Sequence, residues 1–522
     1  MTTLGTAPRR QPEAGTGSVA LARADIVIGR DVLELISSAM YVDPMSIYRE
    51  YVQNAADAID AARAHALDMP GGTGTVAISI DAAARSITIR DNGTGIPSAQ
   101  FARRMTALGG SAKRGSGARG FRGVGRLAGL GYAQELVFRS RVDGETLASE
   151  IRWDCRRLRT KLREAGQDDI VDLIRDIASV RRTTLPDHPD RFFEIELKGV
   201  VRLRSDRLMN PAAVAEYLGQ VAPVPFSEDF RFGPEIAAAL GGAVGLGDLD
   251  IRVLGVADPV RRPHRDTFAI DESRTAAFTS LETLELPGID GGAAAIAWVL
   301  HHDYEGALPA ATSIKGLRLR SGNIQVGDYA LLEELFPETR FNAWSVGEVH
   351  VVDNRIVPNG RRDHFEQNAH YHNLVNHLTP LARDIAKRCR TGSVRRKWLR
   401  DFEVHRQVAT EKIAIVAQGS LGQAERQAIS LATEQTIMQM ERIAGMDLFA
   451  DSEPETLRAG AALLRQDLAT AMSEAVPAAS PLARLPAERR AMYEHLFDLV
   501  YECSTNRTAA KALIDRILMK IT

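Results

Sequence analysis

Apolar and polar positions follow two different periods in the first part of the chain. Helical spacing runs through DVLELISSAM at 31–40, and Asp43 and Pro44 then indicate the N-cap and first position of a second helix, which carries YREYVQNAADAID at 48–60. The runs TVAISI and SITIRD follow on either side of DAAAR. Their β-branched residues and the turn between them predict a hairpin.

The same pattern divides the rest of the chain into regions. ELVFRSR, SEIRWD and RFFEIELKGV predict further strands, with a charged helical insert at about 155–185 between the last two. A second region of mixed helix and strand begins near residue 208, and helix formers dominate from about 375. We therefore predict an α+β protein. Its parts are a disordered lead-in at 1–24, an α/β domain at 25–205, a middle α/β domain at 206–374 and a mostly helical C-terminal region at 375–522, which is a candidate for dimerisation.

One stripe of the helix at 48–60 is polar although the rest of the helix is apolar. Glu50, Asn54 and Asp57 are four and then three residues apart, so they share a face. The amide oxygen of Asn54 suits a hard cation such as Mg²⁺. Glu50, one turn earlier, could orient and deprotonate a water molecule. A solvated helix face is the plainer interpretation of such a trio taken alone.

The stretch RDNGTGIP at 90–97 places an acid where a predicted strand ends. Gly93 and Gly95 allow the backbone to approach a flat ligand. The carboxylate of Asp91 could accept a hydrogen bond from an exocyclic amine of that ligand. An ordinary turn is the alternative for so short a motif.

Glycine and basic residues crowd the next segment, LGGSAKRGSGARGFRGVGRLAGLG at 108–131. It contains nine glycines, and no acid occurs from Asn92 to Gln134. Glycine turns expose backbone N–H groups to phosphate, so we expect a mobile phosphate-covering lid. A flexible surface loop or a nucleic-acid patch is the alternative, whereas GSGARG lacks the preceding strand of a dinucleotide fingerprint. The basic residues of this region are Arg103, Arg104, Lys113, Arg114, Arg119, Arg122 and Arg126.

In this order, the three motifs resemble those of the Bergerat-fold ATPase superfamily of gyrases, heat-shock chaperones, histidine kinases and mismatch-repair ATPases. The resemblance implies a Bergerat-fold α/β sandwich that binds ATP and Mg²⁺ and hydrolyses ATP to ADP and phosphate. REYVQNAADAID is similar to the N-box, with Glu50 as general base and Asn54 as Mg²⁺ ligand; DNGTGI and GFRGVG are similar to the two glycine boxes. The implied ATP-binding residues are Asn54, Asp57, Asp91, Gly93, Gly95, Ile96, Lys113, Gly120, Phe121, Arg122, Gly123, Val124 and Gly125.

Two further stretches resemble the heat-shock protein ninety family. The run from Arg30 through LELISSAMYVDPMSIYREYVQNAADA is similar to the family's opening. VVDNRIVPNGRRDHFE resembles the middle-domain loop whose arginine reaches the γ-phosphate, and Arg362 is the match, with Arg361 as the neighbouring candidate. Two departures accompany the resemblance. RFFEIELKG is similar to the closing strand but lacks the family's threonine, and GFRG is closer to the mismatch-repair lid.

Composition and charge restrict the partners and the cellular location that we expect. The formal net charge is -2, so any basic surface must be local, as in KRCRTGSVRRKWLR at 387–400, which has seven Lys and Arg. Cys155, Cys389 and Cys503 lack metal-ligand spacing and are expected to be buried thiols in a reducing compartment. No stretch reaches the roughly 18 apolar residues of a membrane span, and no signal peptide is evident, so we expect a cytoplasmic protein without a membrane partner.

Three function classes follow from these observations. The first is a chaperone-like ATPase, in which ATP closes the lid and drives a homodimeric clamp on client proteins, with Glu50 and Arg362 as catalytic residues. The alternative is an ATP-gated nucleic-acid clamp of the mismatch-repair or chromatin-remodelling type, which the basic lid and the basic run at 387–400 motivate. The third, a sensor kinase, needs a phosphoacceptor histidine on a helical bundle before the ATP domain, and only about 24 weakly ordered residues precede it here.

Overall fold

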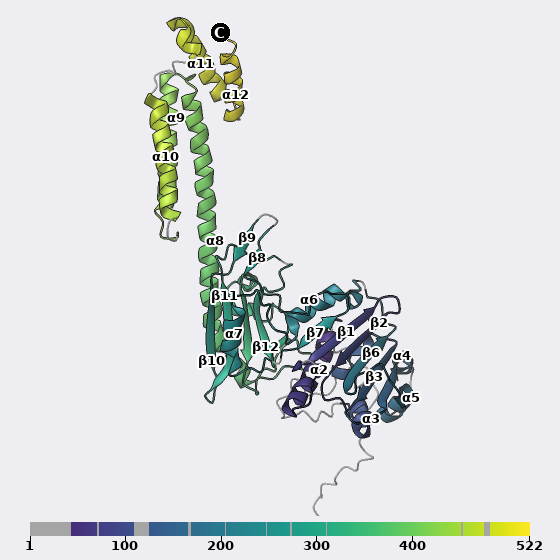
Figure 1. The fold of residues 1–522 in the computed structure, drawn as a ribbon. Coiled ribbons are helices and arrows are strands. Elements are labelled where there is room, and N and C mark those ends of the chain that lie inside the picture. Colours follow the sequence, from purple (N-terminus) through teal and green to yellow (C-terminus); the bar gives the residue numbers. More distant parts are fainter. Residues whose placement is uncertain are drawn as a thin grey trace, which may run out of the picture.

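The protein consists of two sheet-containing bodies that lie side by side and a helical arm that leaves the second body (Figure 1). The computed structural model confirms the expected α+β class, with an N-terminal sheet domain and a helical C-terminal region. The helix expected at 31–40 lies outside the described residues. The described residues are 43–69, 72–108, 125–164, 169–203, 205–246, 248–271, 274–309, 311–449, 453–473 and 481–521.

The first body is built on a mixed sheet of seven strands in the order β5-β4-β3-β6-β2-β1-β7. The expected hairpin is confirmed, because β1 and β2 pair antiparallel with Ile78 opposite Ile89. β7 pairs parallel to β1, so the sheet also uses residues beyond 205; the domain boundary expected there stays a prediction. The strands are β1 (Thr75–Asp81), β2 (Ser86–Asp91), β3 (Glu135–Arg141), β4 (Ala148–Asp154), β5 (Ala178–Thr183), β6 (Phe192–Lys198) and β7 (Asp250–Val253).

The insert at about 155–185, which the sequence predicts to be helical, is only partly helical. It contains α4 (Cys155–Arg163) and α5 (Ile170–Ile177), but its last residues form β5 at the edge of the sheet. Val180 of β5 lies opposite Ile151 of β4. Cross-strand pairing of this kind outweighs a weak local preference for helix.

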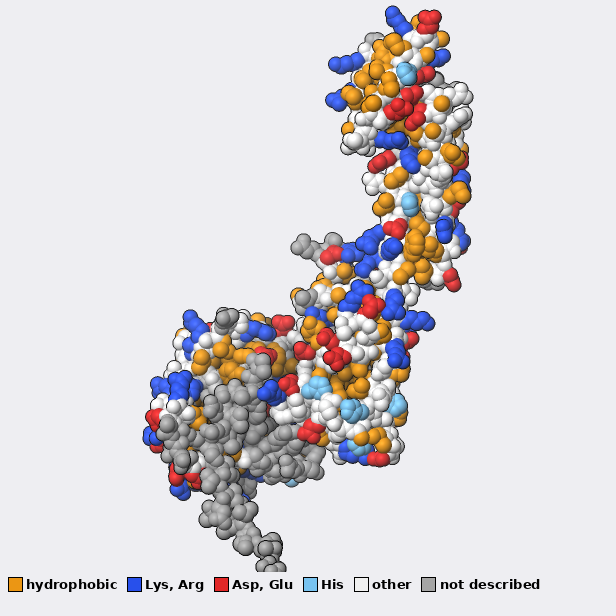
Figure 2. Space-filling view, turned by 180° about the vertical axis from the view of Figure 1, so that it is seen from behind, with side chains coloured by type: hydrophobic (Ala, Val, Ile, Leu, Met, Phe, Trp, Pro, Cys, Tyr) orange, Lys and Arg blue, Asp and Glu red, His pale blue; other side chains and the backbone are white. Residues whose placement is uncertain are grey.

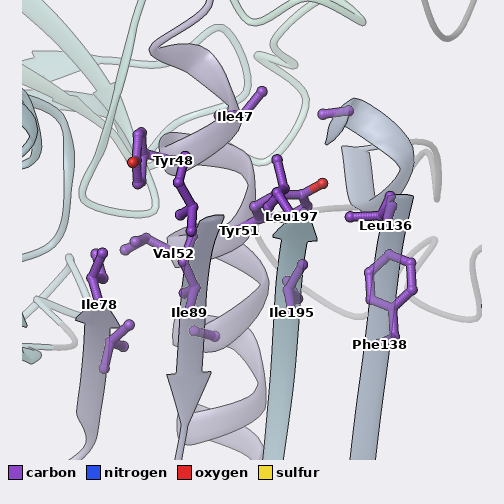
Figure 3. Packing of buried hydrophobic residues seen from close by; sticks show 14 of the residues in the cluster. Ile47, Tyr48, Tyr51, Val52, Ile78, Ile89, Leu136, Phe138, Ile195 and Leu197 are labelled. Carbon is purple, nitrogen blue, oxygen red and sulfur yellow. The ribbon is translucent and has the colours of Figure 1, made fainter. Parts of the chain in front are cut away.

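Helix α2 (Ser46–Ala64) packs its apolar face on the first sheet. Figure 3 shows Val52 beside Ile89 and Tyr51 beside Leu197, over the central strands. Burial of side chains of this size contributes about 1.5–3 kcal/mol each, so the helix is held firmly against the sheet. The other helices of this body are α3 (Ser98–Thr106), η4 (Gly125–Gly131), η5 (Arg207–Met209) and α6 (Pro211–Val221).

Charged residues form a ladder across the opposite face of the same sheet. Five of them lie directly opposite one another in successive strand pairs and alternate in sign, with ion pairs of 2.6–2.8 Å. Successive strand residues point to opposite faces, so the register that forms this ladder also turns Asp91 toward α2. The ladder consists of Arg90, Glu194, Arg139, Glu150 and Arg181.

The second body contains a five-stranded sheet in the order β10-β11-β14-β12-β13 and a small β8-β9 pair. One face of the sheet packs on the first half of α8, and the other contacts α7 through an aromatic cluster around Phe230 and Trp298. The elements are α7 (Gly233–Gly241), β8 (Thr267–Ala269), β9 (Thr275–Ala277), β10 (Ser280–Pro287), β11 (Ala293–His301), β12 (Gly316–Ser321), β13 (Ile324–Val326), η6 (Glu333–Leu335), η7 (Thr339–Trp344) and β14 (Val346–Val351).

A buried carboxylate, Glu348 of β14, joins two arginines where the two bodies meet. Its Oε1 accepts a hydrogen bond from Arg320 Nε at 2.6 Å and its Oε2 accepts one from Arg262. Arg320 also donates to the carbonyl of Gln220 at the end of α6, and Arg262 donates to that of Val224 at 3.1 Å. Burial would raise the pKa of Glu348, but the two arginines hold that pKa well below its usual range. This Glu348 network therefore ties the second sheet to the first body.

The helical arm begins with α8, a single helix of 49 residues. Its first half belongs to the second core and its second half packs with α9 and α10, while α11 and α12 lie at the far end (Figure 1). No helix in the described part of the chain is long and apolar enough to cross a membrane. Cys155 and Cys389 are buried as expected, but the same expectation is wrong for Cys503, which is exposed. The helices are α8 (Ala369–Ala417), α9 (Gln423–Ala444), α10 (Glu453–Ser473), η8 (Pro481–Arg484), α11 (Ala487–Cys503) and α12 (Arg507–Leu518).

Removal of the Glu348 carboxylate is expected to destabilise the fold strongly. Glu348→Ala leaves two buried guanidinium groups without their acid, and breaking such a pair costs about 3–5 kcal/mol of unfolding free energy. Urea unfolding followed by tryptophan fluorescence measures the change. Glu338→Ala is the matched control, because Glu338 bridges Arg340 and Arg390 at the surface, where ion pairs contribute little. Equal effects of the two variants would contradict the role given to Glu348.

Two buried histidines predict a loss of stability in mild acid. Burial lowers the pKa of His264 to about 3 and that of His350 to about 4. Both imidazoles are therefore neutral in the folded protein, whereas the unfolded chain takes up protons below about pH 6.5. The unfolded state then binds more protons, so stability falls as the pH drops from about 6.5 toward 4.

The contribution of His264 to this slope can be isolated by substitution. His264 packs among Phe226, Phe230 and Trp298, so His264→Phe keeps an aromatic ring without the titrating group and should flatten the fall of the urea midpoint with pH. His377→Gln, at an exposed position of α8, should leave the slope as it is. A wild-type midpoint that is constant between pH 6.5 and 4.5 would refute the prediction.

Candidate functional site

Glu50 is buried on α2, and one of its carboxylate oxygens makes no hydrogen bond to the described residues. Its side chain is 9% exposed, and its Oε1 has no hydrogen-bond partner among them. The other oxygen, Oε2, lies against Gly125, where any Cβ would clash with it. The absence of a Cβ at Gly125 allows the backbone to come this close to the carboxylate. A buried carboxylate with an unused oxygen can accept a proton from a water molecule.

Further polar atoms of α2 around Glu50 lack partners within the described part of the chain. Arg49 Nε and Gln53 Oε1 are buried without a hydrogen bond, within one turn of Glu50 Oε1. Native interiors satisfy nearly all such groups, so this surface suits a polar ligand or ordered water. Asn54, half-buried, and Asp57, buried, follow on the same helix.

A metal ion at this place would need ligands from more than the protein. Among the described residues, no group of three or more His, Cys, Asp and Glu could hold a metal ion. The amide oxygen of Asn54 is a suitable ligand for Mg²⁺, which commonly takes few protein oxygens and completes its shell with substrate phosphates and water. The residues present therefore fit a Mg²⁺ ion that arrives with a nucleotide.

The turn after β2 packs directly on the backbone of α2. The carboxylate of Asp91 accepts a hydrogen bond from Gly93 N at 2.9 Å, and Thr94 N donates to the carbonyl of Ala58 at 3.2 Å. A Cβ on Gly93 would lie 2.7 Å from the carbonyl carbon of Ala58, so only glycine fits between the turn and the helix. The acid–glycine turn and the polar stripe of α2, both predicted from the sequence, therefore lie together.

The rest of this turn is supported by neighbouring strands. Gly95 has a φ of +65°, and a Cβ there would approach the carbonyl of Arg141 to 2.6 Å. Ile96 N donates to Ser140 Oγ at 2.7 Å, and Arg191 Nε donates to the carbonyl of Gly93 at 3.0 Å. The backbone of this turn is therefore fixed from three sides, as a rigid binding surface requires.

The end of the glycine-rich segment docks on α2 through η4. Gly129 N donates to the hydroxyl of Tyr51 at 2.8 Å, close to the contact between Gly125 and Glu50. Burial raises the pKa of Tyr51, so its hydroxyl stays neutral. The remaining lid residues predicted for the site lie outside the described residues. They are Lys113, Gly120, Phe121, Arg122, Gly123 and Val124.

The predicted arginine loop of the second body meets α2 through Arg49. Arg49 Nη2 donates to the carbonyl of Arg361 at 2.9 Å, and Nη1 lies 3.4 Å from that of Arg362. The same Nη2 is 3.7 Å from Glu50 Oε1. Arg362 itself is buried with a φ of +55°, and its carbonyl also accepts a hydrogen bond from Gly327 N. The Arg49 side chain therefore connects the backbone of the arginine loop to the part of α2 that carries Glu50.

Sequence reasoning missed Arg49, Gln53 and Arg191, and it counted Arg126 only as one of several basic residues. Arg49 and Gln53 stand inside the N-box motif, so their position beside Glu50 was the available signal. Arg191 gave none, because its contact with Gly93 joins positions 98 residues apart. The closing strand β6 offers Phe193 directly opposite Asp91, where the register of the sheet puts the two residues side by side.

The basic run at 387–400 lies on α8, where the arm leaves the second body. Figure 2 shows Lys and Arg side chains gathered in this region. Arg388, Arg390 and Arg395 each pair with an acidic residue of the same chain. This pairing reduces the positive charge that the run can offer to a nucleic acid.

Known proteins match the part of the chain that contains this site. A family described as histidine kinase-, DNA gyrase B- and HSP90-like ATPase matches residues 44–178. Chaperone protein HtpG of Idiomarina loihiensis is 30% identical over 223 residues, 38% of this chain and 32% of the relative. The HtpG of Polaromonas naphthalenivorans is 27% identical over 202 residues, 34% of this chain and 30% of the relative. The HtpG of Bordetella pertussis is 43% identical over 72 residues, which are 13% of this chain and 11% of the relative. The chain thus matches about a third or less of the length of these relatives.

Removal of the Arg49 side chain is expected to loosen the arginine loop. Arg49→Ala deletes both donors to the loop carbonyls, and hydrogen bonds to a charged group contribute about 1.5–3 kcal/mol, enough to speed local exchange by about tenfold or more. Hydrogen exchange of the Gly327 amide, which bonds to Arg362, reports the change. Arg63→Ala, on the same helix, is the control. Unchanged exchange at residues 327 and 359–363 would show that Arg49 does not hold the loop.

Proposed function

Because residues 44–178 form an ATPase domain of the superfamily of histidine kinases, DNA gyrase B and HSP90, we propose that this protein is an ATP-hydrolysing chaperone close to the heat-shock protein ninety family. The observation that supports this most directly is the buried carboxylate of Glu50, which faces the end of the glycine-rich segment with one oxygen unused among the described residues. The similarity to HtpG chaperones supports the choice of branch.

In the proposed reaction, Glu50 acts as general base. Its Oε1 accepts a proton from the attacking water, whose oxygen forms a bond to the terminal phosphorus of ATP as the bond to the ADP oxygen breaks. Arg49, 3.7 Å from this oxygen, keeps the carboxylate in place. Burial of Glu50 keeps bulk water from competing with the attacking molecule.

The remaining site residues bind and orient ATP in this proposal. Asp91 accepts a hydrogen bond from the exocyclic amine of adenine, and Gly93, Gly95 and Ile96 allow the base and ribose to approach the turn. Asn54 would hold Mg²⁺, which neutralises phosphate charge when bound, and Asp57 supports the nucleotide from the same helix. The phosphates lie at the glycine-rich segment, formed by Lys113, Gly120, Phe121, Arg122, Gly123, Val124 and Gly125.

Arg362 offsets the charge that develops on the terminal phosphate. Its loop already contacts α2 through Arg49, so the arginine belongs to a segment adjacent to Glu50. We propose that ATP closes the lid, that Arg362 then reaches the phosphate, and that hydrolysis resets the two bodies. A homodimer built through the helical arm would turn this cycle into a clamp on a client protein in the cytoplasm.

Glu50→Gln tests the proposed chemistry. The amide keeps the size of the side chain but cannot accept the proton, so kcat for phosphate release should fall by about 10²–10⁴-fold with ATP binding retained. Asp60→Asn, on the same helix outside the site, is the control and should hydrolyse ATP at the wild-type rate. A Glu50→Gln protein with the wild-type rate would show that Glu50 is not the base. A wild-type protein that releases no phosphate would refute the proposed activity.

A further inference from the structure

Arg126 is a half-buried arginine beside the proposed catalytic carboxylate, and two of its guanidinium nitrogens lack a described partner. Its Nε and Nη2 are buried and have no hydrogen-bond partner, and no ion pair to it occurs within the described part of the chain. Burial lowers its pKa to about 10, which still leaves the guanidinium charged at neutral pH. Buried nitrogen atoms of a charged group that lack a hydrogen-bond partner are costly, so they call for an explanation.

The position of Arg126 places its side chain next to α2. η4 is a 3₁₀ helix with three residues per turn, so Arg126 and Gly129 share a face. A Cβ on Gly129 would lie 2.5 Å from the hydroxyl of Tyr51, which shows that this face is turned toward α2. The preceding residue, Gly125, is in contact with Glu50 Oε2. Arg126 therefore leaves the backbone within one residue of the carboxylate that faces the reacting phosphate.

No carboxylate in the described part of the chain forms an ion pair with Arg126. Glu50 is the nearest acid along this path, yet among the described residues its ion pair is with Arg49, at 3.7 Å. An anionic ligand that binds and dissociates would account for this guanidinium. A phosphate suits it well, because it can accept two parallel hydrogen bonds from the planar guanidinium. Since Glu50 must lie beside the water that attacks the terminal phosphorus, the anion nearest to Arg126 is the terminal phosphate.

We infer that Arg126 binds the terminal phosphate of ATP and makes the site discriminate ATP from ADP. The inference rests on the proposed ATPase function. It adds an arginine from the ATPase domain itself to Arg362, which comes from the second body. The free-energy cost of leaving the guanidinium unpaired is then offset only when a triphosphate is bound, because ADP lacks the terminal phosphate that the guanidinium would contact.

The test is to measure the dissociation constants of ATP and ADP, with Mg²⁺, for the full-length protein and three variants by titration calorimetry. Arg126→Met, which keeps the length of the side chain without its charge, should weaken ATP binding by about 10- to 100-fold and change ADP binding much less. Arg126→Lys keeps the positive charge but lacks the planar guanidinium. Its affinity for ATP should therefore lie between those of the wild type and Arg126→Met. Arg156→Met, at an exposed position of α4, is the control and should match the wild type.

Thermal unfolding of the nucleotide-free protein separates binding from a structural role. Removal of an unpaired buried cation should leave the apo midpoint unchanged or raise it, while the stabilisation by ATP shrinks. A lower apo midpoint with an unchanged ratio of ATP to ADP affinity would overturn the inference in favour of a structural role. An unchanged ratio in stable Arg126→Met protein would overturn it as well. A wild type that binds neither nucleotide would instead refute the proposed function, and this inference with it.

Discussion

The structure depends on one buried carboxylate, Glu348, which holds two arginines between the bodies. Each of these arginines also donates to one carbonyl of the first body and to Asn323 of the second, so the second sheet cannot shift without leaving charge unpaired in the interior. The loop that carries Arg362 follows directly from the strand of Glu348. The buried charges therefore do more than join two domains, because they determine where a segment of the second body meets α2.

Helix α2 serves the fold with one side and the chemistry with the other. Its apolar side chains pack on a sheet whose far face is locked by alternating charges, so the helix has a rigid support. Glycines at 93 and 125 bring two other segments against its polar side from different directions. The site is thus a surface between three backbones, in which a methyl group at Gly93 would push the turn away from the backbone of α2.

Local patterns in the sequence were sufficient for the parts of this site that are local. The spacing of Glu50 and Asn54, the hairpin and the acid–glycine turn all follow from residues close together in the chain. Arg49 and its loop partner Arg361 are 312 positions apart in the sequence. No periodicity of apolar and polar residues encodes such a contact. Glu348 alternates with apolar neighbours like any solvent-facing strand residue, so only the tertiary structure distinguishes a buried carboxylate from an exposed one.

Helix α8 has a mechanical consequence. It is embedded in the second core at one end and in the terminal bundle at the other, and its 49 residues span about 70 Å at 1.5 Å per residue. Pro380, the residue that interrupts its backbone hydrogen bonding, lies in the half that is held by the sheet. The half of α8 beyond Cys389 is therefore a lever with its fulcrum at the sheet: it is about 40 Å long, so a tilt of about 10° at the sheet would move the far end of the helix by roughly 7 Å. A modest rearrangement at the base is thus enough to move the far end of α8 by more than the pitch of one helical turn, about 5.4 Å.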